Sequence, residues 1–246
     1  MALARWPGTL GAEAIKVWNK ECATPVSEID LAVDARLKVI LHEIAPDAGW
    51  LSEETADDAA RLDKRRIWCV DPIDGTRDFV RGRKGWCVSI ALVEDGAPTF
   101  GVLYAPARDE IWVAERGKGA SLNGSPIKAS TRHDFAGSRV PTVDLPKADR
   151  DLAKVEQPNS IALRMAMVAD DQADLVATLR WGYEWDIAAA TLIAAEAGAS
   201  VTDAFGKTLR FNTPRAQAFG VLASSPHIHA AAVERLADRA KAIVAS

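Results

Sequence analysis

The stretch from Trp86 to Ile127 constrains the fold of this chain most, because its pattern is that of connected antiparallel strands. Large apolar residues alternate with smaller ones from Trp86 to Leu92, and the pairs Asp95-Gly96 and Asn123-Gly124 are typical of tight hairpin turns. Helical and strand-like segments are interleaved on both sides of this stretch. A chain with an antiparallel middle and interleaved helices indicates a layered α+β architecture rather than a purely parallel sheet.

The flanking segments predict helices, strands and a division into two lobes. The capping-box spacing Ser27-x-x-Asp30 opens a helical stripe of apolar residues that Pro46 closes. We expect further helices over 161–169 and 187–197 and after Ser225-Pro226, and strands over 67–70, 175–179 and 219–223. The polar residues 131–157 are predicted to connect an N-terminal lobe (1–130) with a C-terminal lobe (131–246).

Composition excludes several classes of protein. The 246 residues include 30 Lys and Arg against 34 Asp and Glu, a formal charge of −4, whereas duplex-binding proteins usually carry a basic excess. No apolar run approaches the roughly 18 residues of a membrane span, and residues 1–11 do not form an export signal. The dispersed Cys22, Cys69 and Cys87 form neither a disulfide framework nor a zinc pattern, which fits a reducing compartment. We therefore expect a cytoplasmic protein with no nucleic-acid or membrane partner.

The segment that follows Val70 contains the residues most suited to binding a metal ion and a phosphate. Asp71 ends an apolar strand and Pro72 holds it extended, so Asp71 and Asp74 can point into one cleft. Close carboxylates repel each other unless they are protonated or bridged by a cation, and carboxylate with phosphate oxygens favours Mg²⁺. The helix that starts at Thr76 presents free backbone N–H groups, which suit a phosphate. An isolated Asp-x-x-Asp-Gly is also common in turns and helix caps, so this spacing alone leaves a structural role open.

Four motifs together resemble the inositol monophosphatase superfamily of metal-dependent, lithium-sensitive phosphatases. The run Asp71-Pro72-Ile73-Asp74-Gly75-Thr76 is similar to its first signature, and Trp185-Asp186-Ile187-Ala188-Ala189 with Glu196-Ala197-Gly198 is similar to its second. Upstream, Ser52-Glu53-Glu54 matches an acidic pair, and residues 25–30 match an early acidic segment, all in the family's order. The resemblance implies a layered αβαβα sandwich of the inositol monophosphatase and sugar phosphatase type and a metal-dependent phosphomonoesterase.

The resemblance also implies a role for each matched position. Five groups would hold two or three Mg²⁺ ions: Glu53, Asp71, the backbone carbonyl of Ile73, Asp74 and Asp186. Three side chains would place or deprotonate the attacking water: Glu53, Asp30 and Thr76. The N–H groups of Gly75 and Thr76 would hold the phosphate.

Each acidic position also has a structural alternative. Glu53 would suit a solvated turn, Asp30 the capping box with Ser27, and Asp186 the cap of the helix that follows it. One explanation that covers all four acidic motifs favours the metal site. A non-catalytic relative that binds a phosphorylated ligand would be expected to lack a metal ligand, and none is missing here.

The residues just before Asp186 indicate the substrate. Inositol-type members often place an acidic residue several positions before the Trp-Asp pair, and no acid stands at that place here. The form Glu184-Trp185-Asp186 with Arg180 nearby resembles bacterial 3'(2'),5'-bisphosphate nucleotidases, with Arg180 suited to a second phosphate. The expected substrate contacts are Gly75, Thr76, Ser160, Arg180 and Glu184. Hydrolysis of adenosine 3',5'-bisphosphate to AMP and phosphate is favoured, with inositol-1-monophosphatase, histidinol phosphatase and a phospho-ligand binding protein as alternatives.

The segment before Asp30 departs from the family pattern. Family members usually begin with a longer first helix, and Trp6-Pro7-Gly8 interrupts that segment here. We expect this helix to be missing or rearranged, which bears on the contact of a homodimer.

Overall fold

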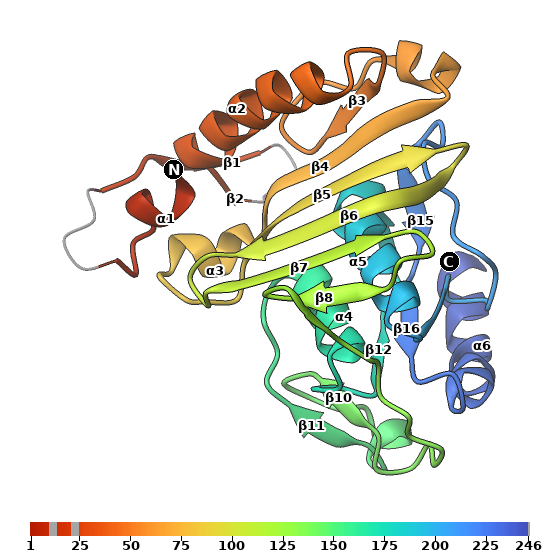
Figure 1. Cartoon of the computed structure of the whole chain (residues 1–246). Coiled ribbons are helices and arrows are strands. Elements are labelled where there is room, and N and C mark those ends of the chain that lie inside the picture. Colours follow the sequence, from red (N-terminus) through yellow and green to blue (C-terminus); the bar gives the residue numbers. More distant parts are fainter. Residues whose placement is uncertain (10–13, 21–24, 246) are drawn as a thin grey trace.

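A seven-stranded sheet organises the computed structural model, which describes residues 1–9, 14–20 and 25–245 (Figure 1). Its strands, in spatial order, are β3 (Gly49–Ser52), β4 (Arg66–Asp74), β5 (Cys87–Glu94), β6 (Ala97–Ala105), β7 (Glu110–Glu115), β8 (Ala120–Leu122) and β9 (Ser125–Pro126). Only β3 and β4 are parallel; the other neighbours pair antiparallel. The predicted antiparallel series is therefore confirmed, and Asp95, Gly96, Asn123 and Gly124 all have positive φ, as tight hairpin turns require.

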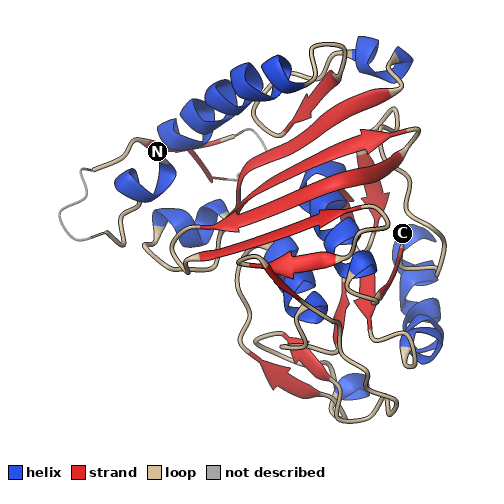
Figure 2. Cartoon of the chain, in the orientation of Figure 1, coloured by secondary structure: helices blue, strands red, loops and turns tan. Residues whose placement is uncertain are grey.

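Helices cover both faces of this sheet (Figure 2). Helix α2 (Glu28–Ile44) lies on one face, and α4 (Ile161–Ala169) and α5 (Glu184–Glu196) lie on the other. The remaining described helices are α1 (Ala2–Arg5), α3 (Thr76–Val80) and α6 (His229–Ala245), with 3₁₀ turns over Ala59–Asp63 and Lys147–Asp149. The alternation of β4 sorts its side chains between the two faces: Trp68 and Val70 pack with Leu41 of α2, whereas Ile67 and Cys69 belong to the core that contains α4 and α5.

Smaller sheets lie beyond α4 and α5. A three-stranded sheet has the order β12 (Leu175–Ala177), β16 (Leu222–Ser224), β14 (Ser200–Thr202). Its cluster with α6 contains Leu175, Leu222, Ile228 and Leu236. Three pairs complete the strands: β1 (Val17–Asn19) with β2 (Pro25–Ser27), β10 (Arg139–Pro141) with β11 (Ala153–Val155), and β13 (Trp181–Tyr183) with β15 (Gln217–Phe219). The succession of helix, sheet, helix, sheet and helix confirms the expected αβαβα architecture.

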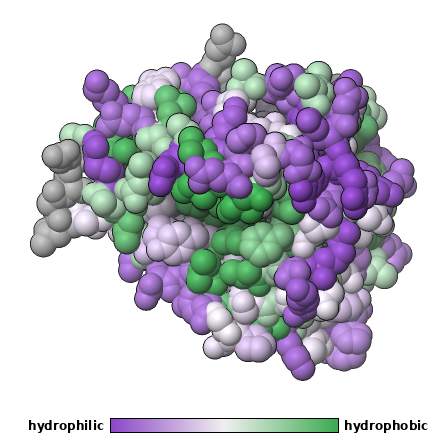
Figure 3. Space-filling view, turned by 45° about the horizontal axis from the view of Figure 1, so that its top comes forward, coloured by the Kyte–Doolittle hydropathy of each residue, from purple (hydrophilic) through white to green (hydrophobic). Residues whose placement is uncertain are grey.

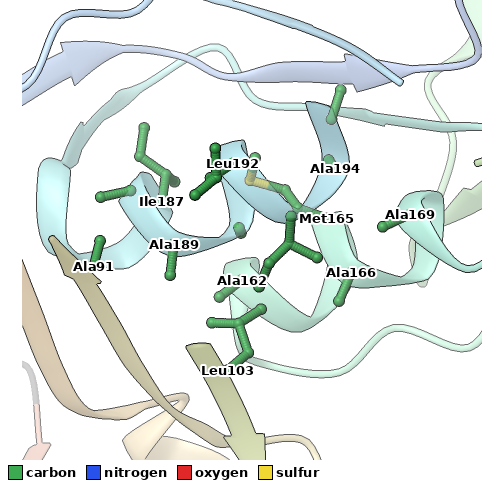
Figure 4. Close-up of a cluster of buried hydrophobic side chains, with 14 of the residues drawn as sticks. Ala91, Leu103, Ala162, Met165, Ala166, Ala169, Ile187, Ala189, Leu192 and Ala194 are labelled. Carbon is green, nitrogen blue, oxygen red and sulfur yellow. The ribbon is translucent and has the colours of Figure 1, made fainter. Parts of the chain in front are cut away.

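The two helices between the sheets pack through small side chains. Ala162 and Ala166 of α4 and Ala189 of α5 are fully buried (Figure 4). A Cβ atom at Gly101 of β6 would lie 3.0 Å from the carbonyl oxygen of Ala189, so a glycine permits this close approach of α5 to the sheet. The approach holds the first turn of α5, which contains Asp186, near the large sheet.

Several predicted boundaries need correction. The strand predicted over 219–223 is two strands, because Gly220 has φ +70° and interrupts it. A Cβ at Gly220 would lie 2.4 Å from the carbonyl oxygen of Thr178, so only glycine fits there. The connection over 131–157 contains the parallel pair β10 and β11 rather than a plain linker.

Two predicted helices begin elsewhere. Helix α5 begins at Glu184, so Asp186 lies in its first turn rather than at its cap. Helix α6 begins at His229, because Ser225 first closes a turn, with the Ile228 N–H donating to the Ser225 carbonyl.

Apolar side chains gather in a hollow beside the short α1 (Figure 3). The groove measures about 750 Å³ and is lined by α1, α2 and strands β5 to β7. Before Trp6, four residues are helical (Ala2–Arg5), and Trp6 itself packs against Trp86 with ring centroids 6.3 Å apart. Of the helices in the described ranges, none is long and apolar enough to cross a bilayer. Cys69 and Cys87 are buried free thiols, and Cys22 lies outside the described residues.

Candidate active site

A pocket of about 180 Å³ lies where the end of β4, the start of α3 and the first turn of α5 meet. It is lined by Pro25, Glu53, Asp71, Ile73, Asp74, Gly75, Thr76, Arg77, Asn159, Ile161, Arg180 and Asp186. Residues from three of the acidic motifs, which span more than a hundred positions in sequence, therefore line one pocket.

The corner at the end of β4 presents two carboxylates to this pocket. The pairing register with β5 shifts between Asp71 and Asp74, so the strand is irregular there. The N–H of Ile73 donates to Oδ1 of Asp71 at 2.9 Å, which folds this side chain back over the corner. Gly75 has φ +94°, and a Cβ there would lie 2.6 Å from the carbonyl oxygen of Gly85. Glycine is thus needed for the chain to turn into α3 at this point.

Asp74 is held by helix α4. Its Oδ2 accepts hydrogen bonds from the hydroxyl of Ser160 and from the N–H of Ala162 at 2.8 Å. Ser160 is fully buried, and its hydroxyl also accepts the Leu163 N–H as the cap of α4. Ser160 does not line the pocket in this structure and is bonded to Asp74 instead, so its predicted contact with substrate stays a prediction. Burial raises the pKa of Asp74 to about 6 against the opposing hydrogen bonds from Ser160 and Ala162.

The pocket carries more negative charge than its own partners balance. Asp71 is 2% exposed, and burial raises its pKa well above the usual range, with further contributions from Glu53 and Asp74. Burial likewise raises the pKa of Asp186, and Asp74 and Glu53 add to the effect. Clustered carboxylates of this kind bind protons or cations in preference to remaining bare.

An ammonium group occupies one side of this acidic cluster. Lys20 Nζ lies 2.9 Å from Oε1 of Glu53 and 2.7 Å from Oε1 of Glu54. Burial lowers the pKa of Lys20, but the two glutamates outweigh it and the net shift is upward. Burial raises the pKa of Glu54 to about 7. Sequence reasoning missed Lys20, because a single lysine more than thirty residues before its partners carries no motif.

The donor set fits a hard divalent cation. Every candidate ligand is an oxygen, from Glu53, Asp71, Asp74, Asp186 or the Ile73 carbonyl, and such donors suit Mg²⁺. Within the described ranges, no three acidic, histidine or cysteine groups are already drawn together at metal-binding spacing. Glu53 is turned to Lys20 instead. Loading with Mg²⁺ would require the carboxylates to close around the ion and Glu53 to leave the ammonium.

Asp30 and Thr76, the two residues expected to handle the attacking water with Glu53, are in contact. The Thr76 hydroxyl lies 3.3 Å from Oδ1 of Asp30 and 3.0 Å from the carbonyl oxygen of Ile73. Asp30 is fully buried behind Thr76, and Oδ2 accepts the N–H of Ser27 in the predicted capping box. Burial raises the pKa of Asp30. The structural and the water-handling roles of Asp30 are therefore compatible.

The two expected specificity residues near Asp186 lie in different surroundings. Arg180 is exposed, lines the pocket and forms no ion pair with any described carboxylate. Glu184 is fully buried, and its carboxylate accepts the N–H groups of Asn212 and Thr213 at 2.6 and 3.0 Å. Glu184 anchors the loop before β15 and does not line the pocket, and its predicted contact with substrate stays a prediction.

Comparison with known proteins agrees with this site. The inositol monophosphatase family matches residues 9–244. The chain belongs to this family. It is 36% identical to "Nus factor SuhB" of Xylella fastidiosa over 209 residues, 78% of this chain and 73% of that relative. It is 34% identical to "3'(2'),5'-bisphosphate nucleotidase CysQ" of Salmonella typhimurium over 216 residues, 83% and 86% of the two chains.

The fold comparison supports the same family. The solved structure of an IMPase from Thermotoga maritima superposes with a TM-score of 0.81, covering 98% of this chain and 93% of that one, at 28% identity. Members of the inositol monophosphatase family are metal-dependent phosphomonoester hydrolases that generally use Mg²⁺, and the present protein is an enzyme of this class.

Proposed function

We propose that this protein is a 3'(2'),5'-bisphosphate nucleotidase, which hydrolyses adenosine 3',5'-bisphosphate to AMP and phosphate. Arg180 carries the proposal: it lines the pocket, with Arg77, among several carboxylates, and no carboxylate of the described residues lies within ion-pair distance of it. A guanidinium binds a phosphate as a fork, so a second phosphate on the substrate would neutralise it. The similarity to CysQ proteins supports the same substrate.

The proposed mechanism assigns each side chain a task around Mg²⁺. Bound Mg²⁺, two or three ions per site, would polarise the ester, lower the pKa of a water molecule and stabilise the leaving oxygen. Its holders would be Glu53, Asp71, the Ile73 carbonyl, Asp74 and Asp186. Thr76 would donate its hydroxyl proton to Asp30 and so turn a lone pair toward the attacking water. The N–H groups of Gly75 and Thr76, which bond no described backbone carbonyl, would hold the phosphate.

A substrate panel tests the proposal. Adenosine 3',5'-bisphosphate, inositol 1-phosphate, histidinol phosphate and fructose 1,6-bisphosphate are each assayed with Mg²⁺, and again after chelation, which should abolish turnover. We expect the highest kcat/KM on adenosine 3',5'-bisphosphate. Faster turnover of inositol 1-phosphate would identify the protein as an inositol-1-monophosphatase, and faster turnover of histidinol phosphate as a histidinol phosphatase. Full activity in metal-free buffer would contradict the mechanism.

The variant Arg180→Ala tests the role of the guanidinium. It should lose about 2–4 kcal/mol of transition-state binding for the bisphosphate, the range of a charge-assisted hydrogen bond plus its unpaired partner. For a monophosphate substrate, the same variant should lose much less transition-state binding. Arg150→Ala, which removes an exposed guanidinium outside the pocket, is the matched control. An equal loss on both substrates would make Arg180 structural.

A further inference from the structure

A second, basic cavity adjoins the acidic pocket. It measures about 780 Å³ and receives five cationic side chains, here called the basic annex: Arg77, Arg81, Arg83, Lys84 and Arg164. Arg77 and Asn159 line both the annex and the acidic pocket, so the two spaces are neighbours. The chain as a whole carries a net charge of −4, so this concentration of positive charge is local.

The cations of the annex are largely unpaired. Among the described residues, no carboxylate lies within ion-pair distance of Arg77, Arg81, Lys84 or Arg164. Arg83 approaches Asp78 only at 4.0 Å and is well exposed. The two carboxylates that line the cavity are Asp78 and Glu156. Asp78 already accepts the N–H of Asn159 at 3.1 Å, so its charge is partly engaged.

Arg164 is the most constrained of these cations. It extends from the second turn of α4, and its Nε and Nη2 donate to the carbonyls of Pro158 and Asn159 at 2.8 and 2.9 Å. It is half-buried, and burial lowers its pKa. The two carbonyls fix the orientation of this guanidinium, and Asp74 and Asp78 act on its charge only from beyond ion-pair distance, so an outside anion can still bind it.

The loop after α3, which carries most of the annex cations, is bonded to the start of α4. The carbonyl of Gly85 accepts the N–H of Ser160 at 2.9 Å, which ties the loop after α3 to the start of α4. A Cβ at Gly85 would lie 2.1 Å from Oδ2 of Asp78 and 2.9 Å from the nitrogen of Asn159. Glycine thus permits the close approach of this loop to Asn159, and the N–H of Arg83 donates to the carbonyl of Asp78 at 2.8 Å, so backbone hydrogen bonds anchor the loop that carries the cations.

We propose that the basic annex is a second phosphate-binding site, which adjoins the acidic pocket and is formed by residues other than Arg180. It would take the dianionic phosphate of a phosphorylated molecule whose other phosphate is in the acidic pocket, or a free phosphate. The first use rests on the proposed phosphatase function and extends it to substrates whose two phosphates lie further apart. The second use does not depend on catalysis. The charge in the annex and the fixed guanidinium of Arg164 are common to both.

The binding test uses the full chain in EDTA, with inorganic pyrophosphate as the probe in calorimetry. The double variant Arg81→Gln/Lys84→Gln should weaken pyrophosphate binding at least about tenfold, since each lost charge-assisted hydrogen bond contributes about 1.5 kcal/mol or more. Lys128→Gln/Arg150→Gln removes the same charge from exposed positions outside the annex and should change the affinity little. Arg164→Gln should also weaken binding, and Arg164→Lys should restore part of it.

The outcomes separate the proposals. Unchanged affinity in Arg81→Gln/Lys84→Gln, or a loss confined to Arg180→Ala, would overturn the annex as a phosphate site. If annex binding is lost, the KM for fructose 1,6-bisphosphate, whose two phosphates lie further apart than those of adenosine 3',5'-bisphosphate, distinguishes the two sources of phosphate. A KM raised about tenfold with kcat and inositol 1-phosphate kinetics unchanged assigns the annex to the substrate itself. An unchanged KM assigns it to a separate phosphate. Absence of all phosphatase activity would contradict the proposed function and leave the EDTA measurement valid.

Discussion

Two groups of buried aspartates in this molecule have opposite surroundings. Asp174, at 1% exposure, accepts hydrogen bonds from the backbone N–H and the guanidinium of Arg139 and from the hydroxyl of Ser130. Burial alone would raise its pKa, but the bonds from Arg139 and Ser130 outweigh burial and lower the pKa to about 2. Asp71 is equally buried, yet its neighbours are carboxylates and its pKa is raised.

The difference shows how one residue type serves stability in one place and ligand binding in another. Around Asp174 the protein supplies every partner, so the carboxylate ties β10 to the segment before β12. Around Asp71 and Asp186 the protein leaves the charge unbalanced, which costs stability until an external cation arrives. An unbalanced buried cluster is a mark of a functional site, whereas a fully bonded carboxylate is a mark of architecture.

The largest expected effect is on catalysis. Asp71→Asn and Asp186→Asn should each lower kcat at least about a thousandfold, because each removes a charge that would position Mg²⁺. The metal-free variants should be at least as stable as the wild type, since each change removes a repelled carboxylate. Steady-state kinetics and urea unfolding in EDTA measure the two quantities. Wild-type kcat in either variant would show that the site is elsewhere.

Asp174→Asn should give the reverse result. It removes the charge of the buried partner in the ion pair with the half-exposed Arg139 and should lower the free energy of unfolding by about 2–4 kcal/mol. Activity per folded molecule should be unchanged. The exposed pair of Arg65 and Asp95 offers a matched control, because Asp95→Asn removes an exposed ion pair that contributes about 0–1 kcal/mol. Similar losses in Asp174→Asn and Asp95→Asn would remove the contrast between the two aspartate environments.

Mg²⁺ should stabilise the folded wild type by less than Asp174→Asn destabilises it. At ten times its dissociation constant a bound ion adds about 1.4 kcal/mol to the free energy of unfolding. Differential scanning calorimetry with and without Mg²⁺ measures the shift. Asp71→Asn should show little or none of it, and Asp174→Asn should show all of it. A full Mg²⁺ shift in Asp71→Asn would place the ion elsewhere.

The smallest effect is the pH dependence of the Asp174 contribution. The pKa of Asp174 is about 2 in the folded protein and about 3.9 in an unfolded chain, so the ionised carboxylate stabilises the folded state fully above about pH 4. The contribution is lost as the pH falls from about 4 toward 2, and roughly 1 kcal/mol is gone by pH 3. The difference in unfolding free energy between the wild type and Asp174→Asn, measured at pH 6 and pH 3, should shrink accordingly. A constant difference would mean that Asp174 does not titrate in this range.

The parts of the structure that local chemistry decides were predictable. The capping box at Ser27 and the hairpin at Asp95-Gly96 depend on neighbours in sequence, and both are confirmed. Interactions that depend on distant segments were not predictable. Lys20 meets Glu53 only because β1 lies near the end of β3, and Glu184 is buried because the loop at Asn212 folds over it. The division into lobes at residue 130 stays a prediction, as do the individual metal and catalytic roles.

The hydrogen bonds from the start of helix α4 to Asp74 have a consequence for ion selectivity. Oδ2 already accepts the Ser160 hydroxyl and the Ala162 N–H, which leaves Oδ1 as the oxygen without a described partner. Asp74 can therefore offer a cation one oxygen, not two. Ca²⁺ commonly takes both oxygens of a carboxylate and tolerates irregular coordination, whereas the smaller Mg²⁺ prefers single oxygens in an octahedron. With Mg²⁺ bound as proposed, Ser160 would also disfavour Ca²⁺ at this corner of the site, because its hydroxyl occupies one of the two oxygens of Asp74.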